Sequence, residues 1–167
     1  GAASVLSRVT LDVEAHAFLA LLGPNGSGKT TLLRLLIGSL QPTAGEVRLN
    51  GRRLAHWSER QRAQWIAYVE QQPDLSYPLS VQDVVLMGRN PYKRRWQWEG
   101  KNDYAKVGEA LRAVGIEHLA GRPVTQLSAG ERQLVSLARA FAQETRFLVL
   151  DEPTASLDLH YALQLLH

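Results

Sequence analysis

The feature that most constrains the fold of this chain is a glycine-rich octapeptide that joins an apolar run to a segment with helical periodicity. Residues 17–22 form the apolar run, which has the length of a buried strand, and residues 29–37 carry the helical pattern. The octapeptide is Gly23-Pro24-Asn25-Gly26-Ser27-Gly28-Lys29-Thr30, which satisfies the pattern G-x-x-x-x-G-K-[ST]. The sequence therefore predicts a strand, a tight loop and a helix in that order.

A loop of this kind is suited to bind phosphate groups. Its glycines let the backbone bend so that several N–H groups point inward, and the helix that follows adds the positive end of its dipole. We expect Lys29 to reach the β and γ phosphates of a nucleotide and the Thr30 hydroxyl to bind Mg²⁺. Thr31, the next residue, belongs to the same expected set of contacts. A glycine turn that matches by chance is the alternative, and the strand-to-helix context disfavours it.

A second motif supplies carboxylates at the end of another apolar run. Residues 147–150 are Phe-Leu-Val-Leu, and Asp151 and Glu152 follow them directly. Asp151 suits the second coordination shell of Mg²⁺, and Glu152 suits the polarisation of a water molecule that attacks the γ-phosphate. Taken alone, the motif is equally consistent with a buried strand that meets a helix cap. Together with the glycine-rich loop it favours a nucleotide site.

Strand-like and helix-like segments alternate along the chain, which indicates an α/β fold with a mostly parallel sheet. We expect one domain over residues 1–167, with a helical subdomain at about 79–130. A basic, aromatic loop is expected at 89–100. The expected strands lie at 9–13, 17–22, 46–49, 65–69 and 147–150, and the expected helices at 29–37, 58–64, 80–87, 103–114, 130–143 and 157–167.

The composition excludes several kinds of protein. The chain has no cysteine, so a disulfide framework and a thiolate metal site are both excluded. Its longest apolar run is far shorter than a membrane span. The net charge of +3 is compatible with nucleic acid, a membrane surface or an anionic ligand as partner and does not distinguish among them. The chain begins at Gly1 and its last helical segment has no cap, so we expect it to be an internal fragment.

The segment 127–133, Leu-Ser-Ala-Gly-Glu-Arg-Gln, resembles the LSGGQ-type signature of ABC ATPases, and it lies upstream of Asp151 as in that family. Ser128 caps a helix there, and Gly130 allows close backbone approach to a phosphate. Gln71 resembles the glutamine of the family's Q-loop, and residues 156–158 resemble its D-loop. Alone, Ser128 would indicate a helix start and Gln71 a polar strand exit. The order of the motifs identifies the chain as a member of the ABC ATPase family.

The resemblance implies a P-loop NTPase core with a mostly parallel sheet, a small antiparallel β part at the N-terminus and a helical signature subdomain. It implies an ATPase in which Glu152, Lys29 and Gln71 are catalytic, and in which Thr30, Gln71 and Asp151 hold Mg²⁺. Ser128 and Gly130 would contact ATP held by a second copy of the chain. The other implied partners are transmembrane permease subunits and a periplasmic or extracellular substrate-binding protein, with no nucleic acid, at the cytoplasmic face of the inner membrane.

Residues 68–92 resemble importers of iron–siderophore, haem and cobalamin type, where this part of the subdomain docks on a permease. The cluster of Lys93, Arg94, Arg95, Trp96 and Trp98 would then lie near lipid headgroups or the permease, or else form a solvated loop. A soluble ABC-type ATPase that acts on ribosomes or DNA and a non-hydrolysing nucleotide-binding module are the alternative functions.

The sequence also departs from the family pattern. Ala129 replaces a glycine of the signature, and Leu134 stands where many relatives carry arginine. The family's switch histidine is expected beyond His167 and its adenine-stacking aromatic residue before Gly1. We therefore expect weak ATP turnover, or none, from these 167 residues alone.

Overall fold

The computed structural model describes residues 5–71, 73, 75–94 and 96–152. Two compact units divide the chain, Gly1–Trp57 and Ser58–His167. The elements of the first unit are α1 (Lys29–Leu36), β1 (Arg48–Leu49), β2 (Arg52–Arg53) and the 3₁₀ helix η1 (Leu54–His56). Those of the second are α2 (Glu59–Ala63), β3 (Ile66–Val69), α3 (Val81–Leu86), η2 (Met87–Tyr92), α4 (Lys101–Ala113), η3 (Glu117–Leu119), η4 (Val124–Gln126), α5 (Ala129–Ala142) and β4 (Phe147–Leu150).

In the first unit, helix α1 follows the glycine-rich loop, which confirms the predicted helix at 29–37. Ile37 is its C-cap, and Gly38 continues in the left-handed region at φ 76°. Glycine is the residue that most readily adopts this conformation at a helix end. The start and the end of α1 are therefore both set by glycines that the sequence displays.

A short antiparallel hairpin, β1–β2, is the sheet of the first unit. Its turn is Asn50-Gly51, and both residues have positive φ, 49° and 75°. This matches the two-residue turn whose twist suits a hairpin. Leu49 in β1 and Leu54 directly after β2 are buried. The hairpin supplies the predicted small antiparallel β part.

The predictions of strands at 9–13 and 17–22 are wrong. Neither segment forms a strand, and Phe18, Leu19 and Leu22 are 63%, 47% and 93% exposed. An apolar run identifies residues that a strand can bury, but a strand also needs a hydrogen-bonded neighbour along its length. The structure provides no such neighbour for these two segments among the described residues.

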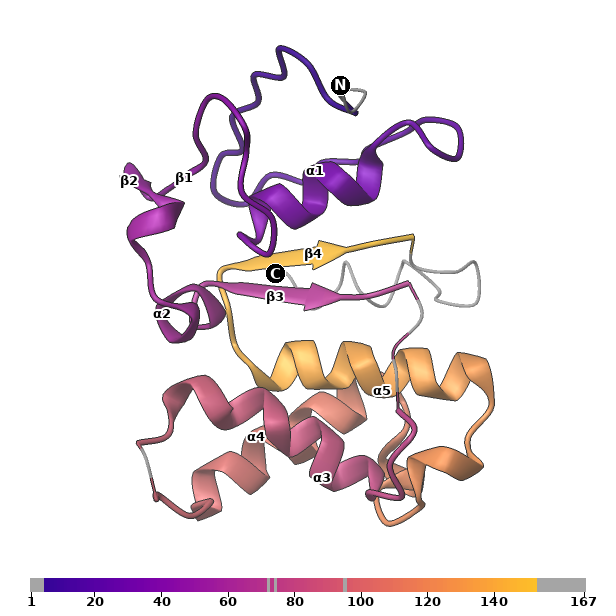
Figure 1. The fold of residues 1–167 in the computed structure, drawn as a ribbon. Coiled ribbons are helices and arrows are strands. Elements are labelled where there is room, and N and C mark those ends of the chain that lie inside the picture. The colour runs from indigo at the N-terminus through magenta and orange to yellow at the C-terminus, as the bar shows by residue number, and fades with distance from the viewer. Residues whose placement is uncertain (1–4, 72, 74, 95, 153–167) are drawn as a thin grey trace. The chain divides into compact units, whose positions relative to one another are not determined.

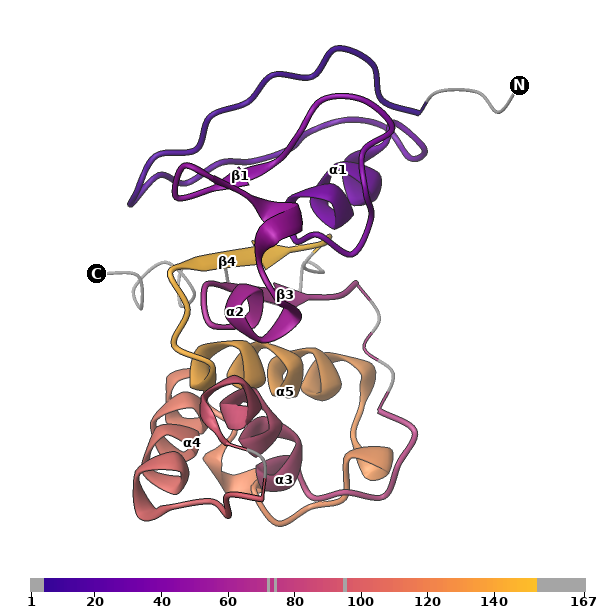
Figure 2. The same ribbon diagram turned by 60° about the vertical axis from the view of Figure 1, so that its left-hand side comes forward.

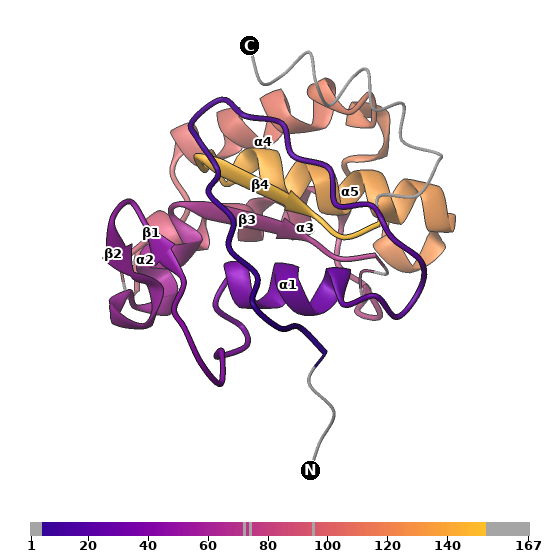
Figure 3. The same cartoon turned by 90° about the horizontal axis from the view of Figure 1, so that it is seen from above.

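The second unit is layered around a two-stranded parallel sheet. β3 and β4 pair over their whole length, with Tyr68 opposite Val149 and Val69 opposite Leu150, and Figure 3 shows them side by side. Helix α5 covers one face of this sheet, and α3 and α4 lie on the far side of α5 (Figures 1 and 2). The parallel pairing of segments about eighty residues apart is what the predicted α/β pattern requires.

Three helices of this unit begin where the sequence predicts, and α4 begins two residues earlier than predicted, at Lys101. Ser58, Ser80 and Ser128 are N-caps, and each hydroxyl accepts a hydrogen bond from a backbone N–H of the first turn. The helix predicted at 103–114 is present as α4 and closes at Gly115, where φ is 73°. Residues 153–167, which include the predicted helix at 157–167 and the D-loop at 156–158, lie outside the described residues.

An apolar core lies between α3, α4 and α5. Its fully or nearly fully buried side chains include Val81, Val85, Val107 and Val135. Leu134 packs against this core as a half-buried side chain. The leucine that departs from the family pattern is thus explained by packing. One domain with a helical subdomain at 79–130 stays a prediction.

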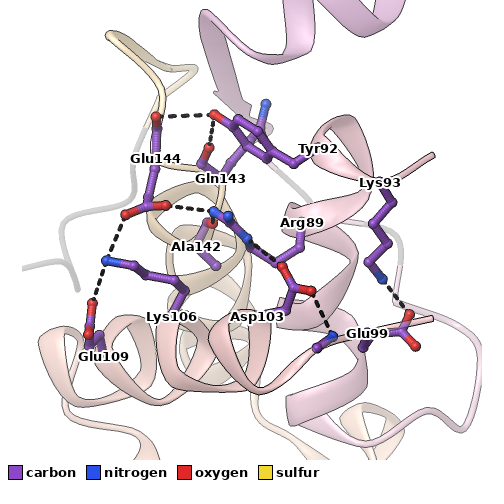
Figure 4. Close-up of polar contacts among 11 residues, drawn as sticks. Arg89, Tyr92, Lys93, Glu99, Asp103, Lys106, Glu109, Ala142, Gln143 and Glu144 are labelled. Atoms are coloured by element: carbon purple, nitrogen blue, oxygen red, sulfur yellow. Dashed lines mark hydrogen bonds and ion pairs between the residues drawn. The ribbon is translucent and has the colours of Figure 1, made fainter. Parts of the chain in front are cut away.

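The prediction of a loop at 89–100 is wrong for its first residues, because η2 extends through Tyr92. Arg89 is 5% exposed, and its guanidinium donates to the Ala142 carbonyl at 2.7 Å and to the Glu144 carboxylate at 2.8 Å. It also donates to Asp103 at 3.2 Å and lies over the ring of Tyr92 (Figure 4). These partners hold a charged residue inside the unit and fix the helical turn that carries it.

The same network ties the end of α5 to its neighbours. The Tyr92 hydroxyl donates to the Gln143 carbonyl at 2.8 Å, and Lys106 on α4 donates to Glu144 at 2.9 Å (Figure 4). Gln143 in turn donates to the Ile66 carbonyl at the start of β3, at 3.1 Å. The last turn of α5, whose carbonyls would otherwise lack partners, is thereby joined to η2, α4 and β3.

Among the residues that the structure describes, every helix is too short or too polar to traverse a lipid bilayer.

Candidate functional site

The glycine-rich loop turns sharply into α1. Gly26 and Gly28 have φ of 80° and 93°, in the left-handed region that favours glycine. A Cβ at Gly28 would lie 2.9 Å from Leu6 Cδ2, and one at Gly23 would lie 2.8 Å from Ser27 Oγ. Because these two atoms are ends of side chains that can move, the requirement for glycine rests on the backbone conformation of Gly26 and Gly28.

Lys29 folds back over this loop. Its Nζ donates to the carbonyl oxygens of Gly23 at 2.9 Å and Pro24 at 3.2 Å. Gly28 is the N-cap of α1, so no capping side chain covers the helix start, and the first turn holds no acidic residue. An ammonium group and an uncapped helix N-terminus both favour an anion. These features favour an anion at the loop, and the binding of nucleotide phosphates by residues 23–30 with Thr31 stays a prediction.

In the second unit the predicted acids lie at the end of β4. The Asp151 N–H donates to the Val69 carbonyl at 3.0 Å, which extends the β3–β4 ladder by one bond. The Asp151 side chain is nearly buried, since the residue is 4% exposed, and its Oδ2 accepts a hydrogen bond from the Tyr68 hydroxyl at 3.0 Å. Asp151 is therefore fixed through both its backbone and its side chain.

Glu152 is the more open of the two acids. It is exposed, and its Oε2 accepts a hydrogen bond from the Gln71 side-chain amide at 2.6 Å. Its backbone has φ of 45°, which is uncommon for a residue with a long side chain. The structure thus brings together two residues that the sequence places eighty-one positions apart, Gln71 and Glu152.

The strand register accounts for the partner of Asp151. Side chains alternate between the faces of a sheet, and residues paired across two strands share a face. Asp151 follows Val149 by two residues, and its N–H still pairs with Val69, so its side chain lies on the face of Tyr68, the partner of Val149. Glu152 comes after the last bond of this ladder and has a left-handed backbone, so its contact with Gln71 is made outside the sheet.

The signature segment begins α5 through a capping box. Ser128 Oγ accepts from the Glu131 N–H at 3.2 Å, and Glu131 Oε2 accepts from the Ser128 N–H at 2.7 Å. These hydrogen bonds hold the pKa of Glu131 below its usual value. Ala129 is exposed, so its methyl group is accommodated without crowding. Gly130 lies in the first turn beside it, and the roles of Ser128 and Gly130 toward a nucleotide stay predictions.

Two residues of this site were not predicted from the sequence. Tyr68 reads as an ordinary strand aromatic, and only the pairing of β3 with β4 brings its hydroxyl to Asp151. Gln133, 3% exposed on α5, donates to the Glu70 carbonyl at 3.3 Å and so links the signature helix to the strand exit before Gln71. The alternation of faces along 66–71 is the signal by which Tyr68 could have been found.

Comparison with known proteins agrees with these motifs. The sequence profile of the ABC transporter family matches residues 6–155. The hemin import ATP-binding protein HmuV of Gloeobacter violaceus is 45% identical over 93% of this chain. An uncharacterized ABC transporter ATP-binding protein, YvrA of Bacillus subtilis, is 42% identical over 99% of it. The chain spans 58% and 38% of the lengths of these two relatives.

Solved structures agree in fold. A chain described as an inward-facing conformation of a metal-chelate type ABC transporter is 37% identical, with a TM-score of 0.78 over 95% of this chain and 60% of its own length. A dimeric bacterial ABC transporter cassette is 29% identical, with a TM-score of 0.82 over 96% of this chain and 71% of its own length. The predicted P-loop NTPase fold is thereby confirmed. From its motifs, its fold and its relatives, this chain belongs to the ABC transporter family.

Proposed function

We propose that the full-length protein is the ATP-binding subunit of an ABC importer and hydrolyses Mg²⁺–ATP. The observation that carries this proposal is the end of β4, where Asp151 is fixed against β3 and Glu152 accepts a hydrogen bond from Gln71. The phosphate loop with Lys29 supports it independently. A Mg²⁺ ion, when bound with ATP, would neutralise charge on the phosphates, and Thr30, Gln71 and Asp151 would hold it.

The residues of the chain divide the work of hydrolysis. The N–H groups of the glycine-rich loop and Lys29 hold the phosphates and orient the γ-phosphate. Glu152 accepts a proton from the attacking water, for which its exposed carboxylate is suited. The amide of Gln71, already at 2.6 Å from Glu152, orients that carboxylate. Ser128 and Gly130 contribute to the site of a second copy, so that two copies enclose two ATP molecules.

The Glu152→Gln variant of the full-length protein tests this assignment. Because an amide cannot accept the proton from water, we expect ATP hydrolysis to fall by at least about a hundredfold while ATP binding is retained. ATP-bound dimers should accumulate in size-exclusion chromatography. Glu109→Gln, which changes an exposed carboxylate of α4, is the matched control and should hydrolyse ATP at the wild-type rate. Unchanged turnover in Glu152→Gln would contradict the assignment.

For the transported substrate we propose haem or a related metal chelate. The relatives that carry the name hemin import ATP-binding protein support this class, as does the structure described as a metal-chelate type transporter. The remaining partners would be permease subunits at the cytoplasmic face of the inner membrane and a substrate-binding protein outside it. The test uses proteoliposomes that contain the full-length protein and the permease encoded by a neighbouring gene. Haem should raise ATP hydrolysis by this complex more than cobalamin or a ferric siderophore does.

A further inference from the structure

We propose that Tyr68 is a positioning residue for Asp151, and that its hydroxyl sets the orientation in which this carboxylate meets Mg²⁺. The proposal rests on the function proposed above, in which Asp151 is part of the Mg²⁺–ATP site. It concerns a residue to which the sequence alone assigns no chemical role, because Tyr68 lies inside strand β3 rather than in a loop.

Burial makes the Asp151 carboxylate depend on hydrogen bonds from the protein. A carboxylate that is 4% exposed has lost most of its water and needs hydrogen bonds in its place. The Tyr68 hydroxyl, 3.0 Å from Oδ2, provides one of them. Phenylalanine would fill the same strand position with the same ring, so the hydroxyl is the part of Tyr68 that acts on Asp151.

The backbone of Asp151 is held in place by strand β3. Its N–H is held by the Val69 carbonyl at 3.0 Å, which fixes the Cα at the end of the sheet. The remaining freedom is rotation of the side chain, and the Tyr68 hydroxyl restrains that rotation by holding one carboxylate oxygen. An ionised carboxylate accepts about four hydrogen bonds. Asp151 can therefore accept from Tyr68 and from a Mg²⁺-bound water at once.

The strand register places Tyr68 within reach of Asp151. Tyr68 is opposite Val149, two residues before Asp151, so a long side chain on the shared face leans along the strand to reach the carboxylate. A shorter polar residue at position 68 would not span this diagonal. Partners that orient a metal-binding group in this way raise metal affinity roughly tenfold to a hundredfold.

The test is Tyr68→Phe in the full-length protein, measured by Mg²⁺ titration of the binding of a non-hydrolysable ATP analogue. We expect the Mg²⁺ concentration for half-maximal binding to rise about tenfold, while affinity for the analogue in EDTA stays at the wild-type value. Tyr77→Phe, which removes a hydroxyl from a tyrosine that is 73% exposed, is the matched control and should leave the Mg²⁺ titration unchanged.

A double-mutant cycle with Asp151→Asn separates positioning from general stability. If Tyr68 acts through Asp151, Tyr68→Phe adds no further change in the Mg²⁺ titration of Asp151→Asn. An equal change in both backgrounds, or a lowered melting temperature with an unaltered Mg²⁺ titration, would overturn the proposal. So would a wild-type titration curve for Tyr68→Phe. If the wild-type protein itself fails to bind Mg²⁺–ATP, the proposed function falls first and the positioning role falls with it.

Discussion

Gly88 shows how closely single positions of this chain are fitted to their surroundings. It lies in η2 against the backbone of α5, and a Cβ placed there would lie 2.3 Å from the Arg139 carbonyl oxygen. Backbone atoms of a helix cannot move aside as the end of a side chain can. Gly108, within α4, has the opposite environment, since its Cβ would meet Arg112 Nη2 at an ordinary 3.8 Å.

We therefore expect Gly88→Ala to lower the free energy of unfolding by about 2 kcal/mol. Gly108→Ala should raise it by roughly 0.5–1 kcal/mol, because alanine is the better helix former and meets no obstacle. Urea unfolding followed by circular dichroism measures both. Equal effects of the two substitutions would show that the close approach of η2 to α5 is absent in solution.

At this scale the sequence reveals local motifs but not long-range contacts. The phosphate loop, Asp151 and Glu152 are predicted as site residues because each belongs to a motif that is local in sequence. Tyr68 and Arg89 could not, because their roles depend on partners eighty-three and fifty-three positions away. A basic residue in a polar segment reads as solvated, and the burial of Arg89 follows only once α5 ends beside it.

Helix α5 is the element that connects the parts of the second unit. Its first turn is the signature segment, its middle packs on the helical core, and its last turn is held by Arg89 and Tyr92. Caps and periodicity predicted the helices because both are local signals. The segments at 9–13 and 17–22 were predicted wrongly, because strand formation depends on a neighbour that periodicity does not reveal.

Acid should weaken the anchorage at the end of α5. The Gly100 N–H and the Arg89 guanidinium hold the pKa of Asp103 below its ordinary value of 3.8, against the opposite effect of burial. A carboxylate with a lowered pKa in the folded state contributes stability above its unfolded pKa, and this is lost as the pH falls through the folded value. Stability should thus decline below about pH 4.

The Asp103→Asn variant should be less stable than wild type at pH 7, and the difference should shrink as the pH falls toward 3. Chemical unfolding at several pH values between these limits measures it. The control is Glu109→Asn, which changes an exposed side chain of α4, the helix that also carries Asp103. Asp83→Asn is unsuited as a control because Ser80 donates a hydrogen bond to that carboxylate in a helix cap. A difference that stays constant with pH would exclude the assigned role of Asp103.

On the scale of the whole molecule, ligand binding and stability are linked. A ligand present at a hundred times its dissociation constant stabilises the folded protein by about 2.7 kcal/mol. We expect Mg²⁺–ATP to raise the melting temperature of the full-length protein, and Lys29→Met to abolish that rise because the phosphates lose their cationic partner. Lys101→Met, at the exposed start of α4, should keep it. Differential scanning fluorimetry with and without nucleotide measures this rise in melting temperature for the wild type and the two variants.

The register that places Tyr68 and Asp151 on one face of the β3–β4 sheet also bears on which changes of length this fold tolerates. Insertions in the surface segments between helices leave the parity of the strands untouched. Deleting Leu150, in contrast, would move the carboxylate of Asp151 to the opposite face of the sheet and away from the Tyr68 hydroxyl. The two-residue separation of Val149 and Asp151 is thus a constraint on evolutionary change. It restricts the number of residues in this segment rather than their identity.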